Sequence, residues 1–493
     1  MKFISTRGEG ERVDSAYAIK TGLAKDGGLF MPESIPAITS EELHLLKDRT
    51  YEQRAAFIIG KFLTDYTEDE LLKDAAAAYS KEKFGASPAP VVKLSGGQYV
   101  LELWHGPTSA FKDMALQIMP RLFTRALKKC NEERTAMILV ATSGDTGKAA
   151  LEGYRDVDGT KIKVFYPELG VSRVQKLQMQ TQEGKNVSVD AIVGNFDDAQ
   201  SGVKRIFSDP DIAKMLDAEG VFLSSANSIN WGRLVPQIVY YVSAYLDMAK
   251  SGEIKMGERI DICVPTGNFG NIFAAYIAKL MGMPFEKFVC ASNVNNVLTD
   301  FLRSGTYDRN RTFFATVSPS MDILISSNLE RFLYTLIGSK ATAGYMKQLN
   351  ENGRYTLTED EFKRVSECFV GYYTTEEQTA DTVREIYEKE NYLIDTHTAV
   401  AVSAAKRYMN DYGAERKILT ASTASPYKFA RDVYKAVSGK DASGDLEALE
   451  ELSAFTSTEI PAPLASILGK KVIHKNVIDK SEMEKSVLDF AKN

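Results

Sequence analysis

The chain alternates short apolar runs, rich in β-branched residues, with longer amphipathic stretches. Three segments repeat the order apolar run, Gly/Ser/Thr loop and helix: TAMILVATSGDTGKAALEGY (135–154), RIDICVPTGNFGNIFAAYIAKLMG (259–282) and RKILTASTASPYKFARDVYKAV (416–437). Continuous apolar runs that alternate with helices are typical of parallel sheets covered on both faces. The pattern therefore predicts an α/β fold with parallel-rich, open twisted sheets flanked by helices.

The remaining hydrophobic pattern predicts how the chain is divided. Four further strands are expected at 161–166, 186–193, 220–226 and 285–292. The first ninety residues differ, with a Gly/Pro-rich loop at 22–36 and helical stretches around 40–80. We expect an N-terminal extension over 1–90 and a catalytic core over 91–493, with a smaller α/β domain inserted at about 130–225. The end of the chain, 475–493, is expected to be a charged surface helix.

Composition excludes several classes of protein. The 493 residues are 44% hydrophobic and 26% charged, with a net charge of -6 and basic residues spread along the chain, so no nucleic-acid surface is expected. No apolar run approaches the roughly 20 residues that cross a bilayer, and the N-terminus has no signal-peptide pattern. None of the four cysteines forms a Cys-x-x-Cys pair, so neither a disulfide framework nor a metal site is expected. A reducing, cytoplasmic location fits these features best, and global charge does not constrain the substrate.

Three loops follow predicted strands and could hold a ligand at the carboxyl ends of a parallel sheet. In TGNFGN (266–271), two glycines allow close backbone approach, and the helix that follows offers free N–H groups to an anion. TSGDTGK (142–148) and TASTASP (420–426) have a similar layout. Each loop alone is also explained as a plain strand-to-helix turn with helix-capping side chains.

Lys112 stands in HGPTSAFKDMALQ (105–117), between an aromatic residue and an aspartate. In an apolar pocket a lysine loses solvation of its charged form, so its pKa falls and more of it is the nucleophilic amine. Such an amine forms a Schiff base with an aldehyde, and pyridoxal 5'-phosphate is the aldehyde cofactor that also needs an anion loop. A lysine whose stem lies on apolar surface with its head in water is the plainer interpretation.

The motif around Lys112 resembles the cofactor-lysine signature of threonine synthases, which are fold type II pyridoxal-phosphate enzymes similar to the β subunit of tryptophan synthase. FISTRG, GLAKDGGLFMPE, ATSGDTGKAA, SANSINWGRLVPQIVYY, PTGNFGN and STASPYKFARDV resemble other family segments, in the family's order along the chain. The length and the N-terminal extension resemble the longer branch of the family. The last loop departs from it, since Ser425 stands where histidine is common.

The resemblance implies a role for each matching residue. Lys112 is expected to be the catalytic residue that bonds the cofactor and later moves protons. The cofactor phosphate is expected at Gly267, Asn268, Phe269, Gly270 and Asn271, and the pyridine nitrogen at Thr423. The substrate's amino-acid end is expected at Ser143, Gly144, Asp145 and Thr146. Asn230 and Arg233 are weaker candidates for the substrate phosphate; Arg233 could equally be a salt-bridge residue.

The implied reaction converts O-phospho-L-homoserine and water to L-threonine and phosphate, the last step of threonine biosynthesis. Three alternatives stay open: a phospho-lyase of the same fold that releases 2-oxobutyrate, another fold type II enzyme such as a serine or threonine dehydratase, and an inactive ligand-binding relative. By analogy with the longer branch we expect a monomer, with a dimer possible.

Overall fold

The computed structural model describes residues 1–142, 144–169 and 171–492. Its described strands form two main sheets and two short antiparallel pairs. The large sheet has the order β13-β10-β9-β14-β4-β3, in which only β3 is antiparallel to its neighbour. Its strands are β3 (Val91–Lys93), β4 (Gln98–Glu102), β9 (Ile260–Pro265), β10 (Phe285–Ser292), β13 (Phe369–Tyr373) and β14 (Ile418–Ser422).

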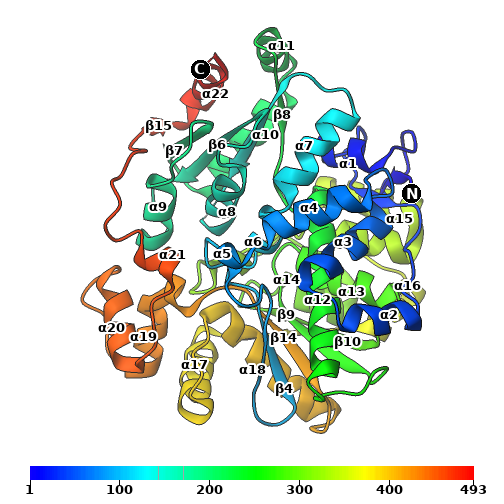
Figure 1. Cartoon of the computed structure of the whole chain (residues 1–493), viewed down its shortest axis with the longest axis vertical. Coiled ribbons are helices and arrows are strands. Elements are labelled where there is room, and N and C mark those ends of the chain that lie inside the picture. The colour runs from blue at the N-terminus through cyan, green and yellow to red at the C-terminus, as the bar shows by residue number, and fades with distance from the viewer. Residues whose placement is uncertain (143, 170, 493) are drawn as a thin grey trace.

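The smaller sheet has the order β15-β7-β6-β5-β8 and is parallel throughout. Its strands are β5 (Thr135–Ala141), β6 (Thr160–Pro167), β7 (Val187–Val193), β8 (Val221–Ser224) and β15 (Val477–Asp479). It lies in the upper half of Figure 1, and the large sheet lies in the lower half. The four predicted strands correspond to β6, β7, β8 and β10.

Helices cover the faces of both sheets, as continuous apolar strands require. Those flanking the small sheet are α8 (Asp145–Tyr154), α9 (Arg173–Gln180), α10 (Phe196–Ser208), α11 (Pro210–Ala218) and α22 (Met483–Lys492). Those of the large sheet include α12 (Trp231–Lys250), α13 (Gly270–Leu280), α14 (Val297–Ser304), α16 (Glu359–Cys368), α17 (Glu376–Glu390), α18 (Thr396–Tyr412), α19 (Ala430–Ser438), α20 (Glu447–Thr456) and α21 (Ala462–Ala465). The long α15 (Leu329–Asn352) is interrupted at Gly338, where φ is 78°.

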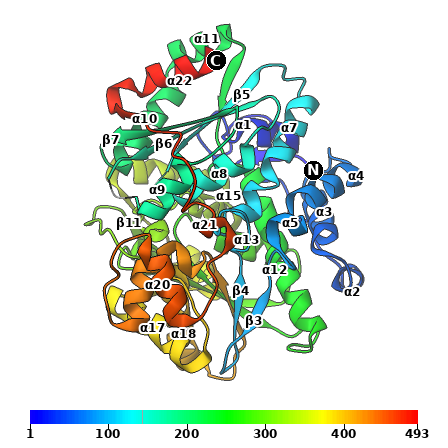
Figure 2. The same cartoon turned by 60° about the vertical axis from the view of Figure 1, so that its left-hand side comes forward.

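The N-terminal region is mostly helical, as expected. It contains β1 (Phe3–Ser5), α1 (Ser15–Thr21), β2 (Phe30–Pro32), α2 (Ser40–Lys47), α3 (Tyr51–Phe62), α4 (Glu68–Ala78) and α5 (Lys81–Phe84). Helices α2, α3 and α4 each begin with a threonine capping box, which satisfies their first free N–H groups. These helices pack beside α12 at one side of the molecule (Figures 1 and 2). The division into domains stays a prediction.

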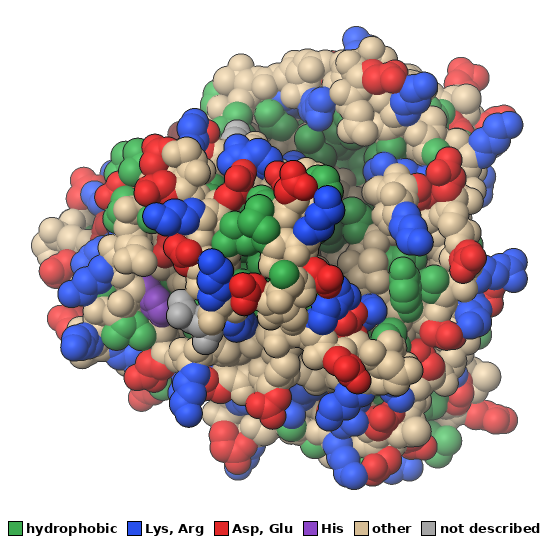
Figure 3. All heavy atoms as spheres, turned by 90° about the horizontal axis from the view of Figure 1, so that it is seen from above, with side chains coloured by type: hydrophobic (Ala, Val, Ile, Leu, Met, Phe, Trp, Pro, Cys, Tyr) green, Lys and Arg blue, Asp and Glu red, His purple; other side chains and the backbone are tan. Residues whose placement is uncertain are grey.

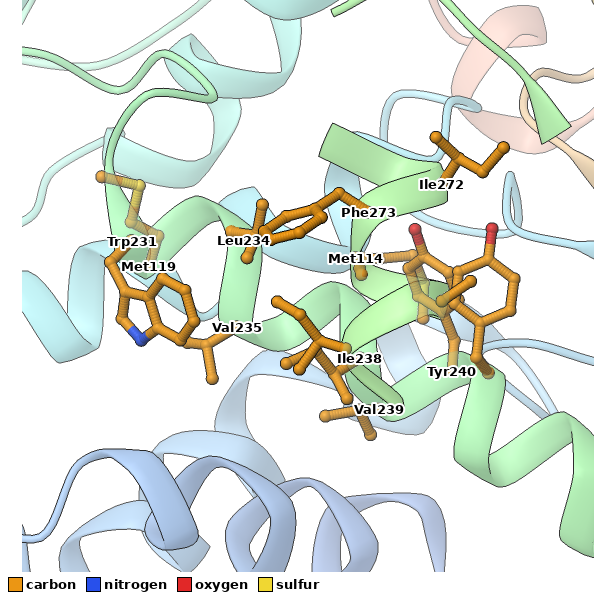
Figure 4. Close-up of a cluster of buried hydrophobic side chains, with 14 of the residues drawn as sticks. Met114, Met119, Trp231, Leu234, Val235, Ile238, Val239, Tyr240, Ile272 and Phe273 are labelled. Carbon is orange, nitrogen blue, oxygen red and sulfur yellow. The ribbon is translucent and has the colours of Figure 1, made fainter. Parts of the chain in front are cut away.

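Helix α12 forms the centre of the core. Nearly all of its side chains are buried, including Trp231 and Tyr240, so its hydrophobic surface runs around the whole helix. Figure 4 shows this cluster, in which Met119 lies beside Trp231 and Met114 lies near Tyr240, with Phe273 and Ile272 of α13 above them. The core thereby joins the segment after Lys112 to the helix after the TGNFGN loop.

The end of the chain differs from the sequence-based prediction of a surface helix alone. Residues 477–479 add β15 to the edge of the small sheet, and α22 follows. Met483 and Val487 of α22 are fully buried against the small sheet's helices. In Figure 1 the red segment runs from α21 across to the small sheet. Three residues flanked by charges gave no strand signal in the sequence.

Charged side chains of both signs lie on the surface. On the face drawn in Figure 3, basic and acidic side chains are interspersed, with no broad area of one sign. No helix within the described residues is both long and apolar enough to span a bilayer.

Candidate active site

Lys112 lies at the end of a turn that is hydrogen-bonded to the TASTASP loop (420–426). Ser109 has a left-handed φ of 58°, and the short helix α6 (Asp113–Leu116) begins directly after Lys112. The N–H of Phe111 donates to the Thr423 carbonyl at 2.8 Å, and the N–H of Ser425 donates to the Ser109 carbonyl at 3.1 Å. These hydrogen bonds bring the lysine loop and the Thr423 loop together at the ends of β4 and β14.

The turn around Lys112 is also fixed from within. Thr108 donates both its N–H and its hydroxyl to the Asp113 carboxylate, at 2.8 and 2.7 Å. Burial raises the pKa of Asp113 to about 6, although the two Thr108 hydrogen bonds oppose the shift. Asp113 is therefore a structural acceptor for the turn and not a solvated surface charge.

The amine of Lys112 is buried, as the sequence predicts for a nucleophilic lysine. Its Nζ lies 3.3 Å from Ser320 Oγ and 3.6 Å from Asp145 Oδ2. Burial lowers the pKa of Lys112; Asp145 opposes the shift, while Lys428 and Arg233 add to it. This environment favours the neutral amine more than water does.

Asp145 is the first residue of α8 and faces two lysines. Its Oδ1 lies 2.6 Å from Lys428 Nζ and accepts a hydrogen bond from Gln175 Nε2 at 2.9 Å. Burial alone would raise the pKa of Asp145, but Lys428 and Lys112 outweigh it and hold this pKa below its ordinary value. Asp145 is therefore an ionised carboxylate between two buried amines, and its side chain does not cap α8.

Lys428 was not predicted from the sequence. Its side chain is fully buried, and its Nζ also donates to the Thr108 carbonyl at 3.0 Å. It thus connects the turn before Lys112 to the first turn of α8. In the sequence it is one lysine of an amphipathic segment after Pro426, and nothing in the local pattern distinguishes it from a surface residue.

The TGNFGN loop has the geometry of an anion-binding turn. Phe269 has a left-handed φ of 61°, a strained conformation for an aromatic residue, and its ring packs on Phe332 and Phe369. Helix α13 starts at Gly270, so its free N–H groups face the loop. A Cβ added at Gly267 would lie 2.6 Å from the Ser320 carbonyl oxygen, so a glycine is required there.

Ser320 joins this loop to Lys112. Its carbonyl lies against Gly267, and its hydroxyl contacts Lys112 Nζ. Its N–H donates to His397 Nε2 at 3.2 Å, and His397 Nδ1 lies 2.9 Å from Asp395 Oδ1. A histidine that accepts at Nε2 donates from Nδ1, so this contact assigns the neutral tautomer. Neither Ser320 nor His397 was predicted as a site residue, because the segment around 320 has no motif of its own.

The residues present fit a phosphate-bearing cofactor. Within the described residues, the buried amide nitrogens of Asn271 and Asn328 have no hydrogen-bond partner. The Asn271 oxygen accepts from Tyr240 and Tyr241, each at 2.6 Å, which fixes the orientation of its amide. Asn328 Nδ2 lies beside Gly270. Buried donors without acceptors are rare, and phosphate oxygens would supply acceptors here.

The remaining predicted residues differ in whether their polar groups already have hydrogen-bond partners in the protein. The hydroxyl of Thr423 makes no hydrogen bond within the described part of the chain, whereas the Ser425 hydroxyl accepts from the Tyr427 N–H. Gly144 precedes α8, with Thr146 half-buried in its first turn. Ser143 lies outside the described residues. Asn268 contributes its carbonyl to the Asn328 N–H.

Asn230 and Arg233 have different surroundings. Both polar atoms of the Asn230 side chain are used: Oδ1 accepts from the Gly232 N–H and Nδ2 donates to the Ile19 carbonyl. Arg233 is buried and donates to the Ala226 carbonyl, while its Nε has no partner among the described residues. No acid pairs with it there, and burial lowers the pKa of its guanidinium to about 10. A buried cation without a counter-ion suits an anionic ligand.

Comparison with known proteins defines the class of this enzyme. A family model described as pyridoxal-phosphate dependent enzyme matches residues 83–423. Together with the parallel sheets flanked by helices, this places the chain in the fold type II pyridoxal-phosphate enzymes and confirms the predicted fold class and cofactor. Models for the threonine synthase N terminus and C-terminal region match residues 2–79 and 398–483.

The chain belongs to the threonine synthase family. It is 37% identical to threonine synthase of Pseudomonas aeruginosa over 446 residues, 89% of this chain and 91% of that protein. The crystal structure of PLP-bound threonine synthase from Brucella melitensis superposes with a TM-score of 0.88 at 35% identity and full coverage of both chains. The chain is also 40% identical to human threonine synthase-like 1 over 86% of its own length, but spans 58% of that longer relative.

Proposed function

We propose that this protein is a threonine synthase that converts O-phospho-L-homoserine and water to L-threonine and phosphate. The observation that carries the proposal is the buried Lys112 amine, held by Ser320 beside the Gly267–Phe269 turn and by Asp145 at the start of α8. The named threonine synthase of Pseudomonas aeruginosa, aligned over nearly its whole length, supports it.

The cofactor and substrate are assigned to opposite sides of Lys112. The turn 267–269, the first turn of α13 and the amides of Asn271 and Asn328 would hold the cofactor phosphate, with Thr423 at the ring nitrogen. When bound, the cofactor's ring supplies an electron sink for negative charge that develops at the substrate carbons. Free N–H groups at the start of α8 and the Thr146 hydroxyl suit the substrate carboxylate.

Proton transfer is assigned to Lys112. With substrate bound, the Lys112 amine would act at the substrate Cα. Its lowered pKa favours the neutral amine, which could accept a proton there and later return one. Asp145 lies within reach to stabilise the ammonium form that results, and Lys428 balances the Asp145 charge.

The substrate phosphate leaves as an anion. A cation that is not already paired with an acidic side chain would stabilise its departure. Arg233 supplies one, since its guanidinium is buried and its Nε has no partner within the described residues. A planar guanidinium holds a phosphate with two hydrogen bonds, which would stabilise the leaving group.

One incubation tests the proposal. The purified protein is mixed with pyridoxal 5'-phosphate and O-phospho-L-homoserine, and phosphate and threonine are measured together. Equal amounts of both are expected. Phosphate with 2-oxobutyrate and no threonine would instead indicate the phospho-lyase, and release of neither product would contradict both. The Lys112→Ala variant is the matched control and should lose turnover together with the visible absorption of the bound cofactor.

A further inference from the structure

A polar cavity is lined by Gln117, five residues after Lys112 along the chain. Its volume is about 420 Å³, and α5, α7 (Met119–Lys129) and α8 contribute to its walls. Gln117 and Gly153 form part of its inner wall, and Lys83 and Arg121 lie at its sides. Neither Lys112 nor the TGNFGN loop lines it. It is therefore distinct from the candidate active site.

The cavity has an excess of unpaired basic groups. Neither Lys83 nor Arg121 has a side-chain hydrogen bond or ion pair within the described part of the chain, although both are half-buried. Burial lowers the pKa of Lys83 and Arg121 adds to the shift, while Glu152 and Asp113 oppose it. Two adjacent cations in a concave site repel each other unless an anion lies between them.

The acidic groups of the same cavity form no ion pair with Lys83 or Arg121 within the described residues. Glu152 already pairs with Lys148 at 3.0 Å. Asp156 accepts the Lys185 N–H at 2.7 Å through Oδ1. Asp158 is exposed at the rim.

Gln117 points to a ligand independently of charge. It is 4% exposed, and its Nε2 is a buried donor without an acceptor among the described residues. It lines the cavity together with Arg121, one turn away on the adjoining helix. A buried amide of this kind is normally satisfied, so an acceptor inside the cavity would complete it.

We propose that this cavity binds a small anion through a phosphate or carboxylate group, held by Lys83, Arg121 and the Gln117 amide. All three groups donate hydrogen bonds, and two of them carry charge, which is the donor set that such anions require. The proposal does not depend on the reaction assigned above, because the site shares no residue with it.

An anion bound in this cavity would influence the position of Lys112. Gln117 immediately follows α6, and α6 starts immediately after Lys112. A Cβ added at Gly153 of α8 would overlap the Leu116 carbonyl oxygen, so α6 and α8 touch at the inner wall of the cavity. An anion there would bind the pair of helices that present Lys112 and Asp145, which makes the cavity a candidate effector site.

Calorimetric titration of the holoenzyme tests the proposal, with inorganic phosphate in one arm and citrate in the other, at low ionic strength. Wild-type protein should bind at least one of them with a Kd of roughly millimolar order. Arg121→Gln and Lys83→Gln should each weaken that binding about tenfold, since each removes a charge-assisted hydrogen bond. Lys214→Gln, on the exposed face of α11, is the matched control and should bind as the wild type does.

Gln117→Leu separates ligand binding from folding. Because the Gln117 amide nitrogen has no partner within the described residues, this variant should keep the thermal midpoint of the wild type while binding the anion several-fold more weakly. The proposal is overturned if the wild-type holoenzyme binds neither anion, or if the cavity variants bind as tightly as the wild type, which would place the anion elsewhere. The two arms show whether phosphate or carboxylate is preferred.

Discussion

At the residue scale, the site depends on charges that are balanced within the protein. Three buried side chains contact one another here: the Asp145 carboxylate lies between the amines of Lys112 and Lys428. Burial of a charge is costly unless it is paired, so each member sets the protonation of the others. Lys428 can therefore influence catalysis without touching the cofactor or the substrate.

Lys428→Met tests this coupling. Loss of the Lys428 charge removes a group that lowers the pKa of Lys112 and leaves Asp145 to Lys112 alone, so the pKa of Lys112 should rise. The acid limb of kcat against pH, which reports the substrate complex, should move to higher pH. Breaking this buried pair should also lower the free energy of unfolding by about 3–5 kcal/mol.

Lys435→Met is the control for that experiment. Lys435 forms a comparable 2.8 Å ion pair with Asp441, but both side chains are largely exposed. Its loss should change neither the pH profile nor the thermal midpoint appreciably. An unchanged pH profile in a folded, cofactor-loaded Lys428→Met variant would contradict the proposed coupling.

Asn230 and Arg233 should respond differently to substitution, although both were predicted to hold the substrate phosphate. Asn230→Ala removes a helix cap and the hydrogen bond to the Ile19 carbonyl of α1. It should lower the free energy of unfolding by about 1–2 kcal/mol with little change in KM. Arg233→Met should raise KM for O-phospho-L-homoserine at least about tenfold while the cofactor spectrum is retained. Steady-state kinetics and thermal unfolding together distinguish the two variants. A raised KM in Asn230→Ala at an unchanged thermal midpoint would support the predicted role of Asn230 in holding the substrate phosphate.

The sequence predicted the loops at 266–271 and 420–426 from the strands before them and Lys112 from its motif and the family resemblance, and the roles of these residues stay predictions. Lys112, the 267–271 loop and Thr423 each follow a strand of one parallel-rich sheet, and carboxyl ends of parallel strands meet at one edge. Ser320, His397 and Lys428 could not be found in this way. Ser320 is 208 residues from Lys112 along the chain and comes from a loop without periodicity, so its contact is set only by tertiary packing.

At the element scale, close approach of α6 and α8 fixes Lys112 relative to Asp145. Gly153 lies against the Leu116 carbonyl, where even one added carbon does not fit. Because the obstructing atom belongs to the backbone, it cannot rotate away as a side chain could. The absence of a side chain at 153 is thus a condition for the 3.6 Å separation of Lys112 and Asp145.

Gly153→Ala should displace α6 from α8. We expect a loss of about 1–3 kcal/mol in stability from overpacking, with kcat reduced more than tenfold because Lys112 moves with α6. Thermal unfolding and kcat at saturating substrate measure the two effects. Gly344→Ala is the matched control: a Cβ there meets nothing within 4 Å on an exposed helical position, so it should be neutral or slightly stabilising. Wild-type kcat in Gly153→Ala would show that the helix contact does not position Lys112.

At the scale of the whole molecule, the site is shared between two sheets. Lys112 follows β4 of the large sheet, and Asp145 follows β5 of the small sheet. The chain crosses between these parts again near its end, where β15 extends the small sheet and α22 packs on α10 and α11. Lys161 of β6 also donates to the carbonyls of Phe490 and Ala491. The last residues therefore secure the small sheet, although they contribute no atom to the site.

Met483→Ala tests this dependence. Met483 is fully buried between α22 and the small-sheet helices, so its truncation should cost about 2–5 kcal/mol. The loss should be local: hydrogen exchange is expected to rise in β6 and β7 before β9 and β14. Because Asp145 belongs to the weakened part, activity should disappear on heating at a temperature below that at which the large sheet unfolds.

The control is Met215→Ala, at a half-exposed position on α11, which should behave as the wild type. Simultaneous loss of protection in both sheets of Met483→Ala would show that they unfold as one unit and that the C-terminal segment does not hold the small sheet separately.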